Sequence, residues 1–272
     1  MDGRLGSPSN ERVTVDRCTP ADAWSRLGPF AMIAVGRRVQ VLAGLGGHRY
    51  VLKREIAVPR HLDLLRHLHD LDVPVAVPLP TDDGHPFATI EGLAYTLAPA
   101  VPNDDHPPDW TDIGAAIGRL HRAASTFDGP VPTRANLSAY KELAELPNQP
   151  IHGDCHLAKI LTKGGKVSGF VDFDELRLGP RPYDLAYLLA GRPHEEILPA
   201  AARLVAGYHA ANRLTVAERA ALVPATLAVE TIFISWYRIQ EPNASRLKHA
   251  AATHAWIIHH KEQLTRIFTR GG

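Results

Sequence analysis

The sequence predicts an α+β fold of two lobes, an antiparallel-sheet N-terminal lobe and a helix-rich C-terminal lobe. Short β-prone runs separated by glycines fill about the first hundred residues. The proline-rich polar segment APAVPNDDHPP (98–108) follows, and helical patterns dominate beyond it. We therefore expect an N-terminal lobe over 1–98, in which 1–12 are frayed, a connector over 99–108 and a C-terminal lobe over 109–272.

The N-terminal lobe is expected to open with a short helix and to continue as a meander. Thr19-Pro20-Ala21-Asp22 combines an N-cap, a proline at the first helical position and an acid three residues after the cap. Leucines at three-residue steps predict an amphipathic helix over 61–71. The strands that we expect are 30–35, 38–42, 50–53, 75–79, 86–91 and 93–97.

The C-terminal lobe is defined by helical patterns around a loop-like middle. Ile113, Ile117 and Leu120 share one face of a helix predicted over 110–124. The middle, 152–182, contains two β-prone pieces on either side of a glycine turn, which predicts a hairpin. Further helices are expected over 183–190, 195–211, 215–239 and 243–269.

The composition excludes several classes of protein. Lys and Arg number 30 and Asp and Glu number 29, so there is no excess positive charge for a nucleic acid or an anionic membrane surface. The two cysteines, Cys18 and Cys155, are too few and too far apart for a disulfide framework or a Cys-rich zinc module. The start of the chain has no apolar signal region, and we expect a cytoplasmic protein.

Two aspartates are predicted to meet at the ends of the hairpin. Asp154 lies in the run from His152 to His156 before the first β-prone piece, and Asp172 follows the second. Phosphoryl transfer uses such a pair, because one carboxylate takes the proton of the attacking hydroxyl and another holds Mg²⁺ against the phosphates. Lys53, on a predicted strand just before a helix, offers an ammonium to the same phosphates.

In this order, these pieces resemble the aminoglycoside phosphotransferase and choline kinase superfamily, the small-molecule branch of the protein-kinase-like fold. The family motifs H-G-D-x-H-x-x-N, D-F and D-L-A match the loop at His152 to His156, then Asp172-Phe173, then Asp184 to Ala186. Gly114 to His121 is similar to the family's G-x-x-x-x-x-L-H helix. The resemblance covers roughly residues 30 to 240, and the run from Lys53 to Leu97 looks most like the homoserine kinase and spore-coat kinase-like branch.

The resemblance implies a site that uses ATP and Mg²⁺. Asp154 would be the catalytic base, Asp172 would bind Mg²⁺, and Lys53 would hold the α- and β-phosphates against the N-terminal lobe. The other implied positions are backbone groups near the adenine (Leu97, Ala98, Ala100), the loop above the phosphates (Gly36) and the braces of the catalytic loop (His152, His156, Asp184).

Two positions depart from the family pattern. The second metal ligand of the family, an Asn five residues after the catalytic Asp, is Lys159 here, and an ammonium has no acceptor for a cation. Either Lys159 swings away and one Mg²⁺ suffices, or its charge substitutes for the second ion, or the enzyme is impaired. Where many relatives place a glutamate that pairs with the lysine, this chain has His61, with Asp63 and Glu55 as the only nearby acids.

Other interpretations of the same residues are less favoured. His152, Asp154, Cys155 and His156 are metal-ligand types, but no second Cys/His group lies at a ligand-like spacing. Cys155 is interpreted as a buried, inert thiol, because neighbours on a chain tend to point apart. Trp236 and Trp256 are interpreted as core anchors, with the wall of an acceptor pocket as the alternative.

The charge of the last part of the chain bears on the acceptor. From Leu176 to Gly272, twelve Lys and Arg face seven Asp and Glu, which favours a neutral or anionic hydroxylated acceptor over a polycationic one.

The sequence thus predicts an ATP-dependent phosphotransferase acting on a hydroxyl of a small molecule, an antibiotic or a metabolite, without nucleic-acid or membrane partners. Two rivals stay open. One is a nucleotide-binding or scaffold protein that kept the fold and lost efficient turnover, and the other is a kinase acting on Ser or Thr of a peptide.

Overall fold

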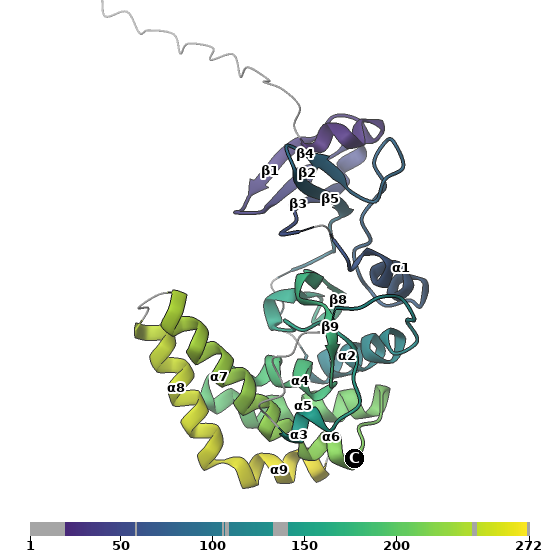
Figure 1. The fold of residues 1–272 in the computed structure, drawn as a ribbon. Coiled ribbons are helices and arrows are strands. Elements are labelled where there is room, and N and C mark those ends of the chain that lie inside the picture. Colours follow the sequence, from purple (N-terminus) through teal and green to yellow (C-terminus); the bar gives the residue numbers. More distant parts are fainter. Residues whose placement is uncertain are drawn as a thin grey trace, which may run out of the picture.

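The computed structural model describes residues 20–57, 59–104, 106, 109–132, 141–240 and 244–270. In this part of the chain, a five-stranded antiparallel sheet lies above a helix-rich body (Figure 1), and the predicted two-lobed α+β fold is confirmed. The lobe boundaries at 98 and 108 stay a prediction, and Cys18 lies outside the described residues.

The N-terminal sheet has the order β1-β2-β3-β5-β4, and all its neighbouring strands are antiparallel. Lys53 lies in its centre, paired with Val39 on one side and Thr96 on the other. Trp24 and Leu52 belong to a small core under the sheet. The elements of this lobe are the 3₁₀ helices η1 (Pro20–Leu27) and η2 (Leu45–Gly47) and the strands β1 (Ala31–Val35), β2 (Val39–Ala43), β3 (Arg49–Arg54), β4 (Ala88–Ile90) and β5 (Leu93–Pro99).

Helix α1 (Leu62–Asp70) packs on the helical body, next to α2 (Trp110–Ala124) in Figure 1. Its buried leucines, among them Leu65 and Leu68, share a core with Ile113 and Ile117 of α2. The short link between β3 and α1 therefore runs from one lobe to the other.

The C-terminal lobe is built around α2 and α5, which cross closely. Glycines allow this approach, because a Cβ on Gly114 would collide with the Leu204 carbonyl oxygen and a Cβ on Gly207 with that of Thr111. The helices that follow α2 in the chain are α3 (Lys141–Ala144), α4 (Pro182–Leu189), α5 (His194–Ala211), α6 (Val216–Ala220), α7 (Leu222–Gln240), α8 (Ala244–His259) and α9 (Lys261–Arg270).

Two small antiparallel sheets of two strands each follow α2 in the chain. The predicted hairpin is confirmed as β7 (Ile160–Lys163) and β8 (Lys166–Phe170), while β6 (Gln149–Ile151) pairs with β9 (Arg177–Gly179). The 3₁₀ turns η3 (Leu157–Lys159) and η4 (Phe173–Glu175) precede and follow the hairpin.

Three element predictions need correction. No strand forms over 75–79, where only Val75 bridges to Phe170, because prolines at 74, 78 and 80 remove ladder donors. The helix expected over 215–239 is divided at Ala221 into α6 and α7, and that over 243–269 is divided at His260 into α8 and α9.

Helix α7 contains a stretch, Leu222–Ile239, that is long and apolar enough to cross a membrane. A single helix of this kind is weak support for a membrane protein, since core helices pass the same test. Its residues Ala225, Ala228 and Val229 are buried in a core shared with α4.

Candidate active site

The 152–156 loop and Asp172 lie at the two ends of the β7–β8 hairpin, as the sequence predicts. Asp172 has a left-handed backbone (φ +67°), so the chain turns sharply after β8. The Val171 N–H donates to the Lys159 carbonyl at 3.0 Å, which ties the two ends together. Gly153 also has a positive φ (+81°), and a Cβ there would collide with the backbone of η4. The loop therefore requires glycine at this position.

Asp184, at the start of α4, holds the loop in place. Its buried carboxylate accepts hydrogen bonds from the N–H groups of His152 (2.8 Å) and Gly153 (2.9 Å) and contacts His121 Nε2 at 2.9 Å. Burial acts to raise the pKa of Asp184, but the hydrogen bond from His121 and those of the loop hold the pKa below its ordinary value. The other ring nitrogen of His121 lies 2.9 Å from the Tyr208 hydroxyl. The predicted brace thus includes His121, to which the sequence assigned no role in the site.

His152 and His156 lie on either side of Asp154. The ring of His152 is buried, with Nε2 at 3.0 Å from the Val171 carbonyl, and His156 Nε2 lies 3.7 Å from Asp154 Oδ2. Burial lowers the pKa of both histidines, so both favour the neutral imidazole. Burial also raises the pKa of Asp154, although the neighbouring His156 and the Lys159 ammonium act to lower it. A carboxyl with a raised pKa is a better proton acceptor than an ordinary aspartate.

Lys53 reaches three carboxylates at the junction of the lobes. Its Nζ lies 2.9 Å from Asp172 Oδ1 and 3.2 Å from Glu55 Oε2, and it also donates to Asp174 Oδ1. These contacts engage the three N–H donors of the ammonium. Arg38, in the turn between β1 and β2, donates to the other oxygen of Asp174 at 2.9 Å. The N-terminal sheet is thus joined to the C-terminal lobe through Asp172 and Asp174.

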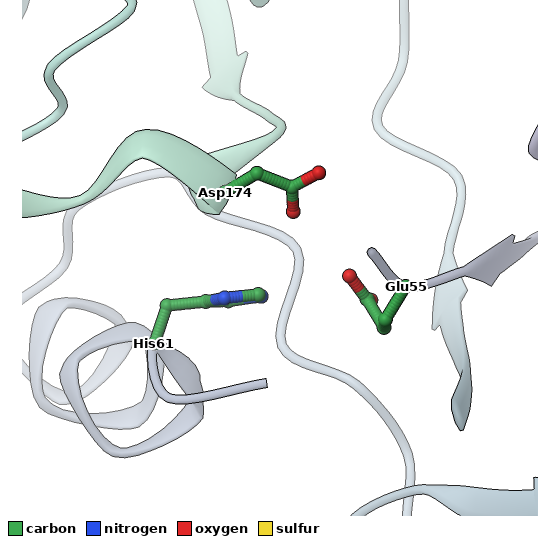
Figure 2. Close-up of side chains that lie close together, drawn as sticks. All are labelled: Glu55, His61 and Asp174. Atoms are coloured by element: carbon green, nitrogen blue, oxygen red, sulfur yellow. The ribbon is translucent and has the colours of Figure 1, made fainter. Parts of the chain in front are cut away.

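Glu55, His61 and Asp174 face one another at this junction (Figure 2). Their ligand atoms lie within 4.8 Å of one another, and all three are metal-ligand types. The Lys53 ammonium already bonds to both carboxylates. Burial, with the charge of Lys53, lowers the pKa of His61 to about 4, so the imidazole stays neutral beside the ammonium. We interpret this group as the cradle of Lys53.

Glu55 pairs with Lys53, a partner for which the resemblance led us to expect a glutamate on the following helix. It lies just beyond the end of β3, is buried, and accepts a hydrogen bond from the Thr96 hydroxyl at 2.5 Å. Burial raises the pKa of Glu55, while the charge of Lys53 acts to lower it. The sequence named Glu55 only as a nearby acid, and its spacing from Lys53 on one extended strand was the signal that could have assigned it.

Lys159 donates to Asp172 Oδ2, so each oxygen of that carboxylate bonds to one ammonium. Burial lowers the pKa of Lys159, while the charge of Asp154 acts to raise it. Lys159 thus lies at Asp172 in this structure, and the three alternatives for its role with ATP and Mg²⁺ stay predictions.

A cavity of about 680 Å³ lies between the lobes and is lined by Lys53 and Asp172. Ala98 and Ala100, the positions predicted for adenine, also line it, although the Ala100 N–H already donates to the Arg49 carbonyl at 2.9 Å. A cavity of this size is typical of a small-molecule or cofactor site.

Two predicted nucleotide positions lie outside the lining of this cavity. Leu97 is fully buried in the core under the sheet, and its carbonyl accepts from the Leu79 N–H at 2.7 Å. Gly36 lies in the exposed β1–β2 turn, whose contact with the C-terminal lobe is made by its neighbour Arg38.

Asp154 lies in a second cavity, of about 620 Å³, on the C-terminal lobe. Glu175, His156 and Arg177 line it with Asp154. Its walls are aromatic: Tyr183, Tyr187, Phe233, Trp236 and Tyr237.

Trp236 is 51% exposed, so its interpretation as a core anchor is wrong and the alternative, the wall of a pocket, holds. Trp256 does pack against the core, stacked on His260.

The other interpretations of the loop find no support. Among the residues that the structure describes, the three-ligand group is the one around Lys53, and Cys155 is not part of it. The Cys155 thiol is buried, and burial raises its pKa well above the ordinary value, as expected of an inert thiol.

The structure combines two lobes, a lysine on the sheet that bonds to Asp172, and aspartates at both ends of a hairpin. This combination is typical of kinase-type phosphotransferases. Comparison with known proteins agrees. Residues 132–222 match the model of the phosphotransferase enzyme family. The chain is 27% identical to the homoserine kinase of Neisseria meningitidis, covering 62% of this chain and 67% of that protein. It is 24% identical to stress response kinase A of Salmonella paratyphi A, covering 61% of each.

The chain therefore spans about two thirds or less of the length of these curated relatives. Solved structures share the fold over most of its length. A microcompartment-associated aminopropanol kinase has a TM-score of 0.70 at 16% identity, covering 87% of this chain and 93% of its own. An amicoumacin kinase in complex with AMP-PNP and Ca²⁺ has a TM-score of 0.66 at 16% identity, covering 88% and 89%. The predicted resemblance to the aminoglycoside phosphotransferase and choline kinase superfamily is confirmed.

Proposed function

We propose that this protein transfers the γ-phosphoryl group of ATP to a hydroxyl of a small molecule. One observation carries the proposal. Asp172 lines the cavity between the lobes, and Asp154 lines the second cavity. Lys159 joins the two, because its N–H donates to the carbonyl of His156 in the Asp154 loop at 2.8 Å and its ammonium bonds to Asp172. A donor site and an acceptor site that adjoin in this way are what phosphoryl transfer requires.

The nucleotide is assigned to the cavity between the lobes. Lys53 would leave part of its carboxylate cradle to hold the α- and β-phosphates, and Ala98 and Ala100 would lie along the base. The AMP-PNP in the amicoumacin kinase complex supports a nucleotide in this fold.

The donors present fit one Mg²⁺. The hard oxygens of Asp172, with nucleotide phosphates, are the ligands that Mg²⁺ prefers, and a carboxylate has about four lone-pair sites, so two ammonium contacts leave room. When bound, the ion neutralises charge on the phosphates. Asp172 would hold it.

Asp154 is assigned the role of the general base, which accepts the proton of the acceptor hydroxyl. The acceptor hydroxyl gives its proton to the Asp154 carboxylate as its oxygen bonds to the γ-phosphorus, and the bond from that phosphorus to the β–γ bridging oxygen breaks, releasing ADP. The raised pKa of Asp154, caused by burial, suits this task.

The acceptor is inferred to be a hydroxylated amine. The excess of basic residues after Leu176 does not describe the cavity, because Arg177 alone of them lines it and it donates to the Gly153 carbonyl at 2.8 Å. Two carboxylates, Asp154 and Glu175, and aromatic faces favour a cation. We propose this in place of the neutral or anionic acceptor that the charge count favours, and the acceptors named for the homoserine kinase and the aminopropanol kinase both carry an amine.

The test is a screen of hydroxylated amines, amine-bearing antibiotics included, each beside its N-acetylated counterpart, for an ATP-dependent mass gain of one phosphoryl group. We expect free amines to be phosphorylated, their acetylated counterparts to react much more slowly, and Asp154→Asn to slow both reactions by roughly 10²–10⁴-fold. ATP binding that Asp154→Asn leaves unchanged, without turnover of any acceptor, would instead indicate a scaffold protein. Phosphorylation of Ser or Thr in peptides added to the same screen would indicate a peptide kinase. We place this activity in the reducing cytoplasm, where the buried Cys155 would stay a free thiol.

A further inference from the structure

We propose that the Lys159 ammonium permanently replaces the second divalent cation, so that this site takes one divalent ion per nucleotide. The inference rests on the proposed function and goes beyond it, since it decides how the charge of the transferred group is balanced.

The chemistry of the donors excludes a second ion at this position. Lys159 stands where the family pattern has an Asn oxygen, and an ammonium offers donors alone. Its ammonium bonds to Asp172 Oδ2, so this carboxylate oxygen already carries a positive partner. A divalent cation there would meet a like charge at close range, with one ligand fewer.

The backbone holds Lys159 in this place. Its N–H donates to the His156 carbonyl at 2.8 Å, and its carbonyl accepts from the Val171 N–H at 3.0 Å. The residue is therefore tied both to the loop of Asp154 and to the residue that precedes Asp172. The side chain is 20% exposed, which leaves the ammonium little alternative to Asp172.

The charge balance of the junction agrees. The cations Lys53, Lys159 and Arg38 match the carboxylates of Glu55, Asp172 and Asp174, all joined through bonds of the same network. Before nucleotide binds, no excess of negative charge remains among these six groups to attract two divalent ions. A nucleotide that brings its own phosphates and one Mg²⁺ fits a junction of this kind.

The experiment counts ions. Mn²⁺, a spectroscopic substitute for Mg²⁺, is titrated into the full-length protein with saturating AMP-PNP, and bound Mn²⁺ is counted by electron paramagnetic resonance. We expect one Mn²⁺ per bound AMP-PNP for the wild type and two for Lys159→Asn. Lys166→Asn is the matched control, because it makes the same change a few residues further along, at a side chain of the hairpin that is 70% exposed and pairs with Asp112, and it should keep one ion.

Two Mn²⁺ per nucleotide in the wild type would overturn the inference while leaving the proposed function intact. One Mn²⁺ in Lys159→Asn, in protein whose circular dichroism matches the wild type, would overturn it as well. Absence of AMP-PNP binding in the wild type would overturn the proposed function itself. The Mg²⁺ dependence of turnover gives a second readout: the wild type should show a single saturation step, and Lys159→Asn should show slower turnover at low Mg²⁺ that rises again in a second step.

Discussion

At the scale of single residues, the site depends on a few buried charges whose partners are fixed. Asp184 satisfies two backbone donors of the 152–156 loop and contacts His121, while its own solvation is lost. A carboxylate in this setting positions the loop, because leaving buried donors without acceptors costs about 1–3 kcal/mol each.

Asp184→Asn is predicted to lower the free energy of unfolding by roughly 3 kcal/mol, since its amide group would face N–H donors. Chemical denaturation measures this. Asp63→Asn is the matched control: its side chain is 74% exposed, and it should change stability by less than about 0.5 kcal/mol. Equal effects of the two changes would contradict the bracing role.

Asp154→Asn is predicted to reduce kcat by roughly 10²–10⁴-fold, the usual contribution of a general base. In the wild type, kcat/KM should fall as pH drops through a pKa above that of an ordinary aspartate, because burial raises the pKa of Asp154. This fall at low pH, the acid limb of the profile, should be absent in Asp154→Asn, because the carboxyl that causes it is gone. A pH profile measured on the acceptor found in the screen decides, and an acid limb that survives in Asp154→Asn would speak against this assignment.

The sequence identified Asp154, Asp172 and Lys53, because each lies in a local motif whose spacing is visible in one dimension. It did not identify Arg38 and Asp174 as partners, because these residues are 136 positions apart in the chain and meet only in the folded structure. Contacts of this kind leave no local pattern.

At the scale of elements, strands and helices with clear periodicity form where the sequence predicts them, and interruptions explain the rest. The β7–β8 hairpin follows from two β-prone pieces around a glycine turn. The expected strand over 75–79 fails because its prolines cannot donate to a ladder, and the longest predicted helices divide at single residues where the packing direction changes. Periodicity locates apolar faces but does not locate such breaks.

Helix α7 carries a buried carboxyl that makes stability depend on pH. Glu230 is fully buried; Oε1 accepts from the Gly191 N–H at 2.6 Å, and Oε2 has no partner among the described residues. Burial raises the pKa of Glu230 from 4.5 to about 7. The folded state therefore keeps the proton that the unfolded chain loses, and the resulting stabilisation is complete below pH 4.5 and is lost as pH rises through about 7.

Glu230→Gln, which mimics the neutral acid, is predicted to stabilise the protein by roughly 3 kcal/mol at about pH 8 and hardly at all at about pH 4.5. Denaturant unfolding of both proteins at the two pH values measures the difference. A gain that is the same at both pH values would show that the carboxyl is not protonated in the folded state.

At the scale of the whole molecule, the two lobes meet through a network in which charges of both signs are matched. Lys53 and Arg38 come from the sheet, and Asp172 and Asp174 come from the far side of the junction. The two-lobed fold and its order of motifs could be predicted from the sequence. The division of the site into a cavity between the lobes and a separate aromatic cavity could not be predicted, because Trp236 and its neighbours reach Asp154 only through the packing of α7.

The most direct test is a crystal structure of the protein with AMP-PNP and Mg²⁺. We predict the triphosphate between Lys53 and Asp172, the base against Ala98 and Ala100, and the γ-phosphate directed toward Asp154. A nucleotide bound elsewhere, or one whose γ-phosphate points away from Asp154 and the aromatic cavity, would contradict the account.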